Sequence, residues 1–157
     1  MAEAETLLLW NWAHFDSLCP GDLYDIIALR TAVFIVEQRC TYQDCDGIDC
    51  VSHHLWTRES DGGIAAYLRV VPPLAKYAEP SLGRVVTAAG VRGTGLGRAL
   101  VREGIARVEQ VYGPRPIRIS AQRYLLRFYE ELGFVATGYD YEEDGIPHAE
   151  MLRAHVC

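Results

Sequence analysis

Residues 91–100 read VRGTGLGRAL, in which three alternating glycines lie between two arginines and precede an apolar run. Glycine lets successive backbone N–H groups turn toward one small volume, because no side chain blocks the approach. The positive end of a helix beginning here would strengthen the field, and guanidinium groups would add charge-assisted hydrogen bonds. This combination predicts a site for a pyrophosphate.

Two familiar phosphate-binding motifs do not fit this stretch. A dinucleotide fingerprint starting at Gly93 and Gly95 needs a third glycine where Arg98 stands. A Walker loop needs a Gly-Lys-Ser or Gly-Lys-Thr ending, which is absent. The pattern that remains is R-x-x-G-x-G, formed by Arg92, Gly95 and Gly97. The glycines alone leave one alternative open, a tight turn that binds nothing.

A second group with potential chemistry is Cys40, Cys45 and Cys50, which recur every five residues among several aspartates. Their spacing matches neither the close cysteine pairs of structural zinc sites nor the spacing of ligands on a helix. The stretch is not a calcium loop either, because its glycine comes two places early and Ile48 occupies a ligand position. We therefore expect separate thiols and no metal.

The composition is that of an ordinary globular protein: 157 residues, 50% hydrophobic and 23% charged. This length suits a single domain, residues 1–157. A net charge of −6 argues against a general affinity for nucleic acid. The early apolar run LLLW is too short for a signal sequence, and no segment reaches membrane-spanning length. We expect a cytoplasmic protein with reduced cysteines and no membrane partner.

Hydrophobic periodicity and turn residues predict the elements that would position these groups. Strands are expected at residues 6–13, 53–60, 63–73, 81–89, 116–122, 134–143 and 146–156, and helices at 22–39, 96–111 and 123–132. A polar loop would occupy residues 40–52. The mixture of hairpins and strand–helix crossovers predicts an α/β (α+β) fold, with a mixed, mostly antiparallel central sheet of about seven strands flanked by helices.

A strand, then R-x-x-G-x-G, then a helix resembles the acyl-coenzyme A loop of the GNAT superfamily of N-acetyltransferases. The stretch RFYEELGF at 127–134 resembles the family's fourth-helix signature, and the predicted element order is also the family order. LRTAVFIVEQRCTYQDCDGID at 29–49 and YEEDGIPHAEM at 141–151 resemble one branch, the ElaA-type acetyltransferases. Together these stretches cover most of the chain.

The resemblance implies that acetyl-coenzyme A is the co-substrate. The main chain of Val85, Val86 and Thr87 would face the pantetheine arm. The phosphates would lie on Arg92, Gly93, Thr94, Gly95, Leu96, Gly97 and Arg98. Many members carry an asparagine on the strand before the acid helix, and the nearest amide here is Gln122. The loop reads TAAG before Val91, without the acidic or proline residues common in the family.

Tyr129 matches the family tyrosine whose hydroxyl lies near the coenzyme sulfur, so the resemblance implies that it is the general acid. A core aromatic with its hydroxyl at the surface is the alternative for any tyrosine at helical spacing. Phe128 and Leu132 already supply apolar packing on the same helix. This favours the catalytic interpretation of Tyr129.

Two residues are candidates for the general base that must deprotonate an amine. Glu37 follows an apolar run, so burial could raise its pKa toward neutrality, although a solvated carboxylate at a helix end is equally consistent. His148 begins the last strand, where a structural histidine is the alternative. Arg84 could orient an acceptor carboxylate or lie at the surface. Of His53 and His54, one should pack and the other face solvent.

The leading hypothesis is acetyl transfer to a primary amine, of a small molecule or of a protein. A non-catalytic acyl-coenzyme A sensor is the alternative, and a metal-binding module at residues 40–54 is a more distant one. The acceptor pocket of this fold is built from the first helix, the 40–52 loop and the last hairpin. An exposed edge strand could support a homodimer.

Overall fold

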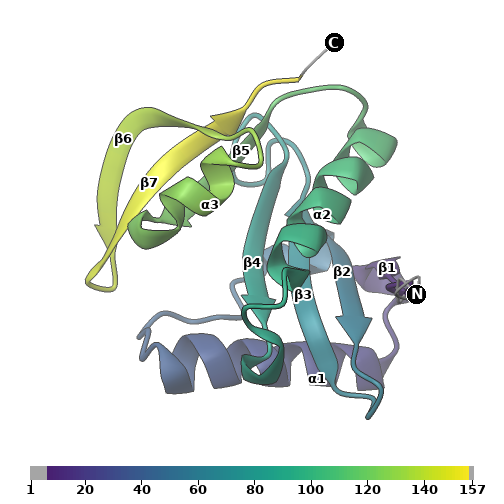
Figure 1. Cartoon of the computed structure of the whole chain (residues 1–157). Helices are drawn as coiled ribbons and strands as arrows, with labels where there is room; N and C mark the ends of the chain where they lie inside the picture. The colour runs from purple at the N-terminus through teal and green to yellow at the C-terminus, as the bar shows by residue number, and fades with distance from the viewer. Residues whose placement is uncertain (1–6, 156–157) are drawn as a thin grey trace, which may run out of the picture.

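This computed structural model describes residues 7–155 (Figure 1). Within that range the chain forms seven strands and three α-helices, joined by loops and short helical turns. The predicted α/β (α+β) fold with seven strands and flanking helices is confirmed. No helix in this part is long and apolar enough to cross a bilayer. In chain order the elements are β1 (Asn11–His14), α1 (Pro20–Arg30), β2 (His53–Arg58), β3 (Ile64–Val71), β4 (Ser81–Thr87), α2 (Leu96–Tyr112), β5 (Ile117–Gln122), α3 (Leu126–Glu130), β6 (Val135–Glu143) and β7 (Ile146–Arg153).

The strands form two sheets, ordered β1-β2-β3-β4 and β5-β7-β6, and every pairing among the described strands is antiparallel. β4 and β5 approach each other at their first residues, where the Arg118 N–H donates to the Pro80 carbonyl at 3.1 Å. From there they run in the same direction without pairing along their lengths. Figure 1 shows the second sheet turned away from the first. The predicted central sheet is therefore divided between β4 and β5.

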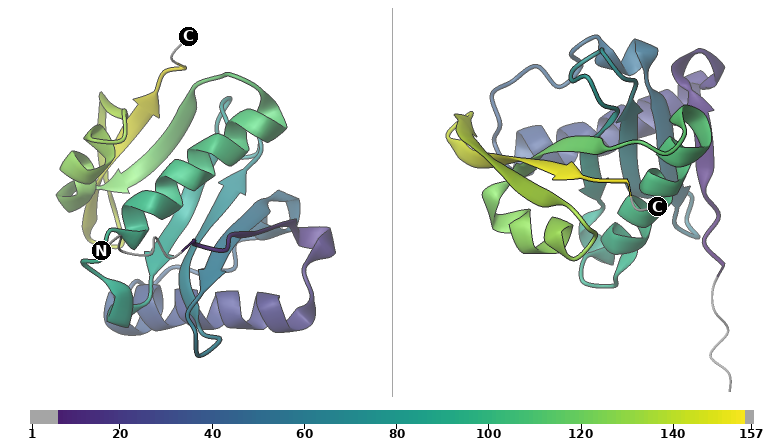
Figure 2. Two further views of the ribbon diagram at one scale, coloured as in Figure 1. Left: turned by 45° about the vertical axis from the view of Figure 1, so that its right-hand side comes forward. Right: turned by 90° about the horizontal axis from the view of Figure 1, so that it is seen from above.

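Helices cover both faces of the first sheet (Figure 2). On one face α2 buries Leu100, Val101 and Val108 against the sheet. On the other face α1 and the segment after it bury Ile26 and Phe34. Because β3 lies in the middle, all eight of its residues are buried. The sequence of β3 accordingly reads as a nearly continuous apolar run.

The first helix is longer and less regular than an α-helix. It begins at Pro20, two residues before the predicted start at residue 22, because Cys19 Sγ accepts the N–H of Asp22 at 3.4 Å and caps the helix. After Arg30 the chain continues as a π-helix over Thr31–Glu37, and the N–H of Gln38 reaches back five residues to Val33. Single π-turns are common at functional sites, where they change the direction of side chains.

Other boundaries also differ from the prediction. The first strand is confined to Asn11–His14, and residue 6 lies outside the described residues. The last predicted helix is a 3₁₀ turn at Arg123–Leu125 followed by the short α3. The last strand ends at Arg153, and Val156 lies outside the described residues. Further 3₁₀ turns lie at Phe15–Ser17, Ile48–Val51 and Ala89–Val91.

Candidate active site

A bulge shapes the edge of β4 that faces β5. Tyr67 opposes Val86 and Arg69 opposes Gly83, so two β4 residues lie opposite Leu68 alone. Arg84, one of these two, has a φ of +52°, in the left-handed region. Bulges bend a strand and leave one residue unpaired. The bend accompanies the divergence of β4 from β5, and among the described strands β4 has no partner along this edge.

The predicted cofactor strand presents its side chains to different surroundings. Val85 lines the gap between the sheets, whereas the side chain of Val86 is buried in the core beneath α1. Thr87, the last residue of β4, lies beside the start of α2: a Cβ added at Gly97 would be 3.7 Å from its methyl group. The end of β4 and the start of α2 are therefore next to each other.

The glycine loop forms a cluster of unengaged donors at the start of α2. Gly93 and Gly95 have φ values of +78° and +86°, which explains why glycine is needed there. Within residues 7–155, no hydrogen bond uses the backbone N–H groups of residues 93–98. The Ala99 N–H donates to the Gly95 carbonyl at 3.1 Å, and the Thr94 hydroxyl donates to Val91 at 2.6 Å. The loop is thus closed on itself while its amides stay available.

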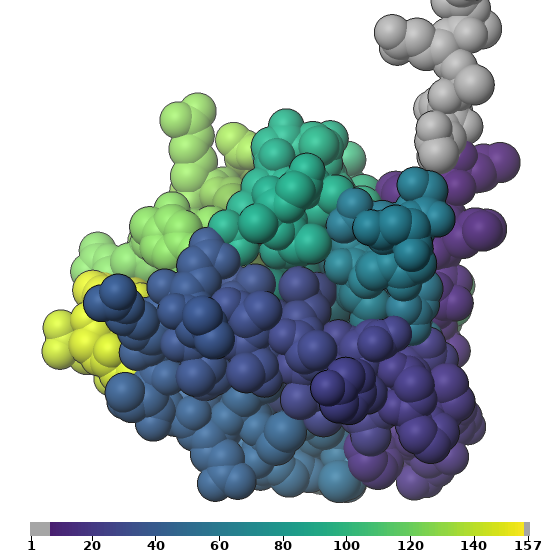
Figure 3. Space-filling model, turned by 90° about the horizontal axis from the view of Figure 1, so that it is seen from below, coloured from purple at the N-terminus to yellow at the C-terminus, as the bar shows by residue number. Residues whose placement is uncertain are grey.

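The two flanking arginines each pair with an exposed carboxylate. Arg92 donates to Glu37 at 2.5 and 2.8 Å, and Arg98 donates to Glu131 at 2.5 Å. Figure 3 shows the face on which the end of the first helical segment lies beside the glycine loop. Surface ion pairs of this kind contribute little free energy. Both guanidinium groups can therefore exchange a carboxylate for a bound phosphate.

Of the two alternatives for Glu37, the structure agrees with the solvated carboxylate at a helix end. Its side chain is 48% exposed at the end of the π-helix, and hydrogen bonds from Arg92 lower its pKa. The apolar residues Val33 and Phe34 of the same π-helix face the core, whereas Glu37, its last residue, lies on the exposed side. The alternative of a buried carboxylate with a raised pKa does not hold.

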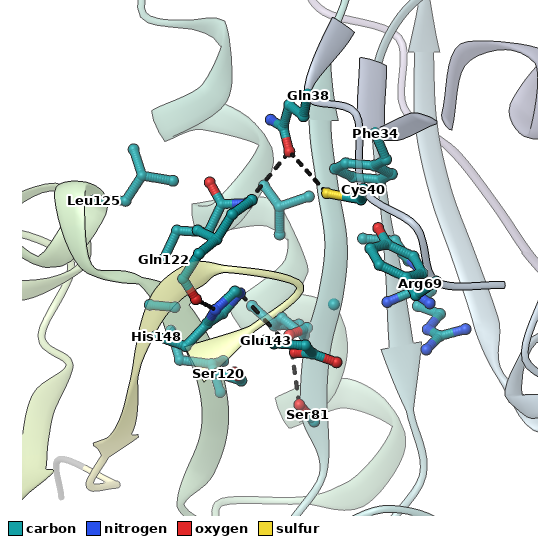
Figure 4. A pocket seen from close by; sticks show the side chains of 18 of the residues that line it. Phe34, Gln38, Cys40, Arg69, Ser81, Ser120, Gln122, Leu125, Glu143 and His148 are labelled. Carbon is teal, nitrogen blue, oxygen red and sulfur yellow. Dashed lines mark hydrogen bonds and ion pairs between the residues drawn. The ribbon is translucent and has the colours of Figure 1, made fainter. Parts of the chain in front are cut away.

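A pocket with a free volume of about 160 Å³ occupies the gap between β4 and β5 (Figure 4). The π-helix, the loop after it, the β6–β7 turn and α3 complete its walls. The predicted acceptor elements therefore meet the predicted cofactor strand at one cavity. Residues from each wall include Gln38, Cys40, Arg84, Val85, Ser120, Gln122, Tyr129, Glu143 and His148.

Tyr129 is both a core aromatic and a pocket residue. Its ring makes edge contacts with Phe128 and Phe134, at centroid distances of 5.0 and 5.8 Å. The residue is only 6% exposed, but it lines the pocket. Burial raises the pKa of its hydroxyl, and within the described residues no hydrogen bond engages that hydroxyl. The two interpretations of this tyrosine are therefore compatible.

His148 is held in one orientation within the pocket. Its Nδ1 lies 2.7 Å from the Ile146 carbonyl oxygen, and because a carbonyl can only accept, Nδ1 must carry the hydrogen. Nε2 then has a lone pair in the neutral ring, and it lies 4.0 Å from a carboxylate oxygen of Glu143. The ring stacks on Tyr141 at a centroid distance of 5.6 Å. These contacts fix the tautomer that a base requires.

Gln122 lies opposite His148 across the β5–β7 pair. Its side-chain Nε2 donates to the side-chain Oε1 of Gln38 at 3.2 Å (Figure 4). This hydrogen bond links the end of β5 to the residue that follows the π-helix. Cys40 contacts the same Gln38 side chain, because its Sγ lies 4.0 Å from Gln38 Oε1. Gln122 thus joins the two sides of the pocket.

Residues 33–154 match the family model described as an acetyltransferase (GNAT) domain. The chain belongs to the GNAT acetyltransferase family. Relatives that span nearly the whole chain place it with the ElaA and UPF0039 proteins. It is 34% identical to Protein ElaA of Escherichia coli over 149 residues, which are 94% of this chain and 97% of ElaA. It is 41% identical to a UPF0039 protein of Synechocystis over 143 residues, 91% and 93% of the two chains.

Solved structures of two relatives have the same GNAT fold. An acyl-CoA N-acyltransferase from Pseudomonas aeruginosa superposes with a TM-score of 0.88 at 40% identity, over 94% of this chain and 99% of that one. Escherichia coli ElaA superposes with a TM-score of 0.86 at 33% identity, over the same fractions. The predicted resemblance to the GNAT superfamily and its ElaA-type branch is confirmed.

One feature of this GNAT protein escaped the sequence analysis, a buried network of arginines and aspartates. Arg30 donates to Asp44 at 2.9 Å and to Asp49 at 2.8 Å. Arg69 donates to Asp49 at 3.0 Å and to Asp46 at 2.7 Å. Both guanidinium groups are almost fully buried. The network ties the polar loop, residues 40–52, to α1 and β3.

Arg84 joins the same network from the β4 bulge. Its Nε donates to Asp44 at 2.8 Å, and its guanidinium lies 4.9 Å from the centre of the Tyr42 ring. The aspartates among the three cysteines, Asp44, Asp46 and Asp49, therefore accept hydrogen bonds from arginines. Within residues 7–155, no group of three or more His, Cys, Asp or Glu could hold a metal. The aspartate-rich loop was the only sign of this network in the sequence. The arginines that bind the loop come from three other elements, α1, β3 and β4, so no local pattern connects them.

The paired histidines of β2 lie outside the pocket. His54 is fully buried, with Nδ1 2.7 Å from the Tyr67 hydroxyl and Nε2 3.1 Å from the Asp49 carbonyl. His53 is partly exposed and stacks on Trp12 at 4.8 Å. One packs and the other is near solvent, as expected, and both have structural contacts.

Proposed function

We propose that the protein is an acetyl-coenzyme A-dependent N-acetyltransferase that acts on a primary amine. The observation that carries the proposal is the set of unengaged N–H groups at residues 93–98, located where the gap between β4 and β5 opens. A pyrophosphate fits such a cluster, because it accepts several hydrogen bonds and is stabilised by the helix dipole. Arg92 and Arg98 would contact its edges.

The free edge of β4 suits the rest of the coenzyme. Acetyl-coenzyme A supplies the acetyl group as a thioester. Since no strand of residues 7–155 pairs with β4 on this side, the main-chain groups of Val85, Val86 and Thr87 would be available to the pantetheine arm. A backbone N–H from this segment would donate to the thioester carbonyl and stabilise the negative charge that develops on its oxygen.

Tyr129 would stabilise the departing thiolate. Burial keeps its hydroxyl protonated, so it remains a hydrogen-bond donor at neutral pH. A cysteine-like thiol has a pKa of about 8.5, below that of a buried tyrosine. We therefore assign Tyr129 a strong hydrogen bond to the sulfur, with the proton passing to it only as the thiolate leaves the carbonyl.

His148 is the residue we propose as general base. A lysine-like amine has a pKa of about 10.4, so most of it arrives protonated. His148 lines the pocket with Nε2 free to accept that proton, directly or through water. Glu37 is less suited, because its pKa is lowered and its carboxylate is engaged by Arg92. We propose that Glu37 instead positions Arg92 beside the glycine loop.

The acceptor would be a small-molecule amine or an amino group of a protein. Glu143 and Asp144 line the pocket, whereas the positive charges of Arg69 and Arg84 are matched by aspartates. The carboxylates would attract an ammonium group to the pocket.

The experiment is thiol release from acetyl-coenzyme A with a panel of small amines and lysine-containing peptides. Acetyl transfer to any of them supports the enzyme. Tight coenzyme binding with no transfer to the whole panel would contradict it and favour the non-catalytic sensor. If the folded protein neither binds acetyl-coenzyme A nor transfers the acetyl group, the proposed coenzyme site is wrong as well.

A further inference from the structure

Lys76 is the single lysine of the 157-residue chain, and it lines the active-site pocket. The other fourteen basic side chains are arginines, which do not accept acetyl groups at neutral pH because they stay protonated. Tyr129 and His148, the proposed acid and base, line the same pocket. The one side-chain amine of the protein is therefore placed beside its own candidate transfer site.

The loop that carries Lys76 is held in a fixed shape. It joins β3 to β4, and the Leu74 N–H donates to the Tyr77 carbonyl at 2.7 Å, closing a turn around Lys76. Leu74 has a φ of +72°, which a leucine adopts only where its surroundings impose it. Farther along, Glu79 accepts two hydrogen bonds from Arg118, both at 2.8 Å. A closed, anchored turn thus holds Lys76 at the pocket wall, with its Nζ 5.4 Å from the centre of the Tyr77 ring.

Desolvation at the pocket favours the neutral, reactive form of Lys76. The residue is exposed at the rim of the pocket, but partial desolvation lowers the pKa of its ammonium. Among the neighbouring charges, the carboxylates of Glu143 and Asp46 raise this pKa, whereas the guanidinium groups of Arg69 and Arg84 lower it. A lowered pKa increases the neutral fraction, which is the nucleophile. Glu143 also lies 4.0 Å from His148 Nε2, so the amine and the proposed base have a common neighbour.

We propose that Lys76 is a self-acetylation site, modified in cis by the active site of the same molecule. This inference rests on the proposed function. The lone pair of Nζ would attack the acetyl carbonyl carbon, so that a C–N bond forms and the C–S bond breaks. The electron pair leaves with the sulfur, which gains a proton from the side of Tyr129. The proton lost from Nζ passes to His148 or to water, and the product is acetyl-lysine and free coenzyme thiol.

Acetylation would change the pocket, because it replaces an ammonium group by a neutral and longer amide. The positive charge that faces Glu143 would be lost. Less positive charge would then offset the carboxylates of the pocket. The pocket would therefore bind cationic acceptors more strongly. The modification would therefore alter which amines bind.

The test is to incubate the full chain with acetyl-coenzyme A and locate acetyl groups by intact mass and peptide mass spectrometry. We expect one acetyl group on Lys76, at a rate independent of protein concentration, absent in Lys76→Arg and slower in Tyr129→Phe. Since the chain has one lysine, the peptide carrying it is distinguished from an acetylated N-terminal amine.

Three results would overturn the inference. One is an unmodified Lys76 in protein that transfers acetyl groups to the amine panel, which would leave the proposed function standing. The second is acetylation at the same rate in urea-unfolded protein, which would mark a chemical side reaction. The third is a rate that rises with protein concentration, which would mark transfer between molecules. If neither the panel nor Lys76 is acetylated, the proposed function fails as well.

Discussion

Two single residues of the pocket, Tyr129 and His148, serve both in packing and in the proposed chemistry. The ring of Tyr129 packs against two phenylalanines, and the same residue lines the pocket. The ring of His148 stacks on Tyr141, and one nitrogen is used to fix its orientation. In both cases the packing leaves one polar atom available. Substitutions that remove only that atom can therefore separate catalysis from stability.

Replacing Tyr129 by phenylalanine should lower turnover by about 10²-fold, the lower end of the range for general acid catalysis. The ring contacts with Phe128 and Phe134 remain, so coenzyme affinity should change by less than about twofold. Thiol release at saturating substrates and calorimetric titration measure the two quantities. Tyr139→Phe is the matched control, because Tyr139 is exposed and lies outside the pocket. Unchanged turnover in Tyr129→Phe would refute the role of its hydroxyl.

The two candidate bases should respond differently to substitution. His148→Ala should lower kcat by about 10²-fold, with partial recovery when imidazole is added. Glu37→Gln should leave kcat within about twofold, because Glu37 is exposed and already engaged by Arg92. Steady-state kinetics of both variants with one amine decides between them. A larger loss of kcat in Glu37→Gln than in His148→Ala would reverse the assignment.

At the scale of elements, α2 connects the core to the proposed coenzyme site. Its first turn supplies the free amides, and its middle packs closely on the sheet. The two functions place different demands on the glycines of this helix. A Cβ at Gly104 would lie 2.8 Å from a methyl group of Leu68, whereas a Cβ at Gly97 would lie 3.7 Å or more from its neighbours.

Gly104→Ala should therefore lower the free energy of unfolding by about 1–3 kcal/mol, the usual cost of overpacking a core. Gly97→Ala should not lower it, because the new methyl group makes ordinary contacts and alanine favours helix by about 1 kcal/mol. Urea unfolding of both variants provides the comparison. Equal free energies of unfolding for the two variants would show that α2 and β3 leave room for a methyl group at position 104.

The sequence predicted those parts of the fold that local chemistry determines. Alternating glycines before an apolar periodic run located the start of α2, and Asp144-Gly145 located the last hairpin turn. It did not predict the π-helix, because the same apolar residues would suit an α-helix. It also could not decide between a buried and a solvated Glu37, since its partner Arg92 lies 55 residues away and no local pattern connects them.

At the scale of the whole molecule, the arginine–aspartate network joins α1, the polar loop, β3 and β4 around one wall of the pocket. Burial opposes ionisation of Asp46 and Asp49, but hydrogen bonds and charge from Arg69 and Arg30 outweigh it, so the pKa of each is lowered. A lowered folded pKa adds stability above the unfolded pKa of about 3.9 and loses it as the pH falls through the folded value.

Asp49→Asn should destabilise the protein at pH 7 by about 3–5 kcal/mol, because two buried guanidinium groups lose a shared carboxylate. Its stability should also fall less than that of the wild type between about pH 5 and pH 2, since one of the acid-sensitive groups is gone. Urea midpoints across this range measure both effects. Glu130→Gln, at an exposed position, is the control. An unchanged midpoint at pH 7 would mean that the network contributes no net stability.

The central claim is that the amides at the start of α2 bind the pyrophosphate of an acyl-coenzyme A. The most direct measurement is calorimetric titration of the folded protein with acetyl-coenzyme A and, separately, with acetyl-pantetheine, which lacks the pyrophosphate and nucleotide. The account predicts one-to-one binding of acetyl-coenzyme A, and affinity for acetyl-pantetheine weaker by at least about 10²-fold, or about 2.7 kcal/mol. Equal affinity for the two, or no binding of acetyl-coenzyme A, would contradict it.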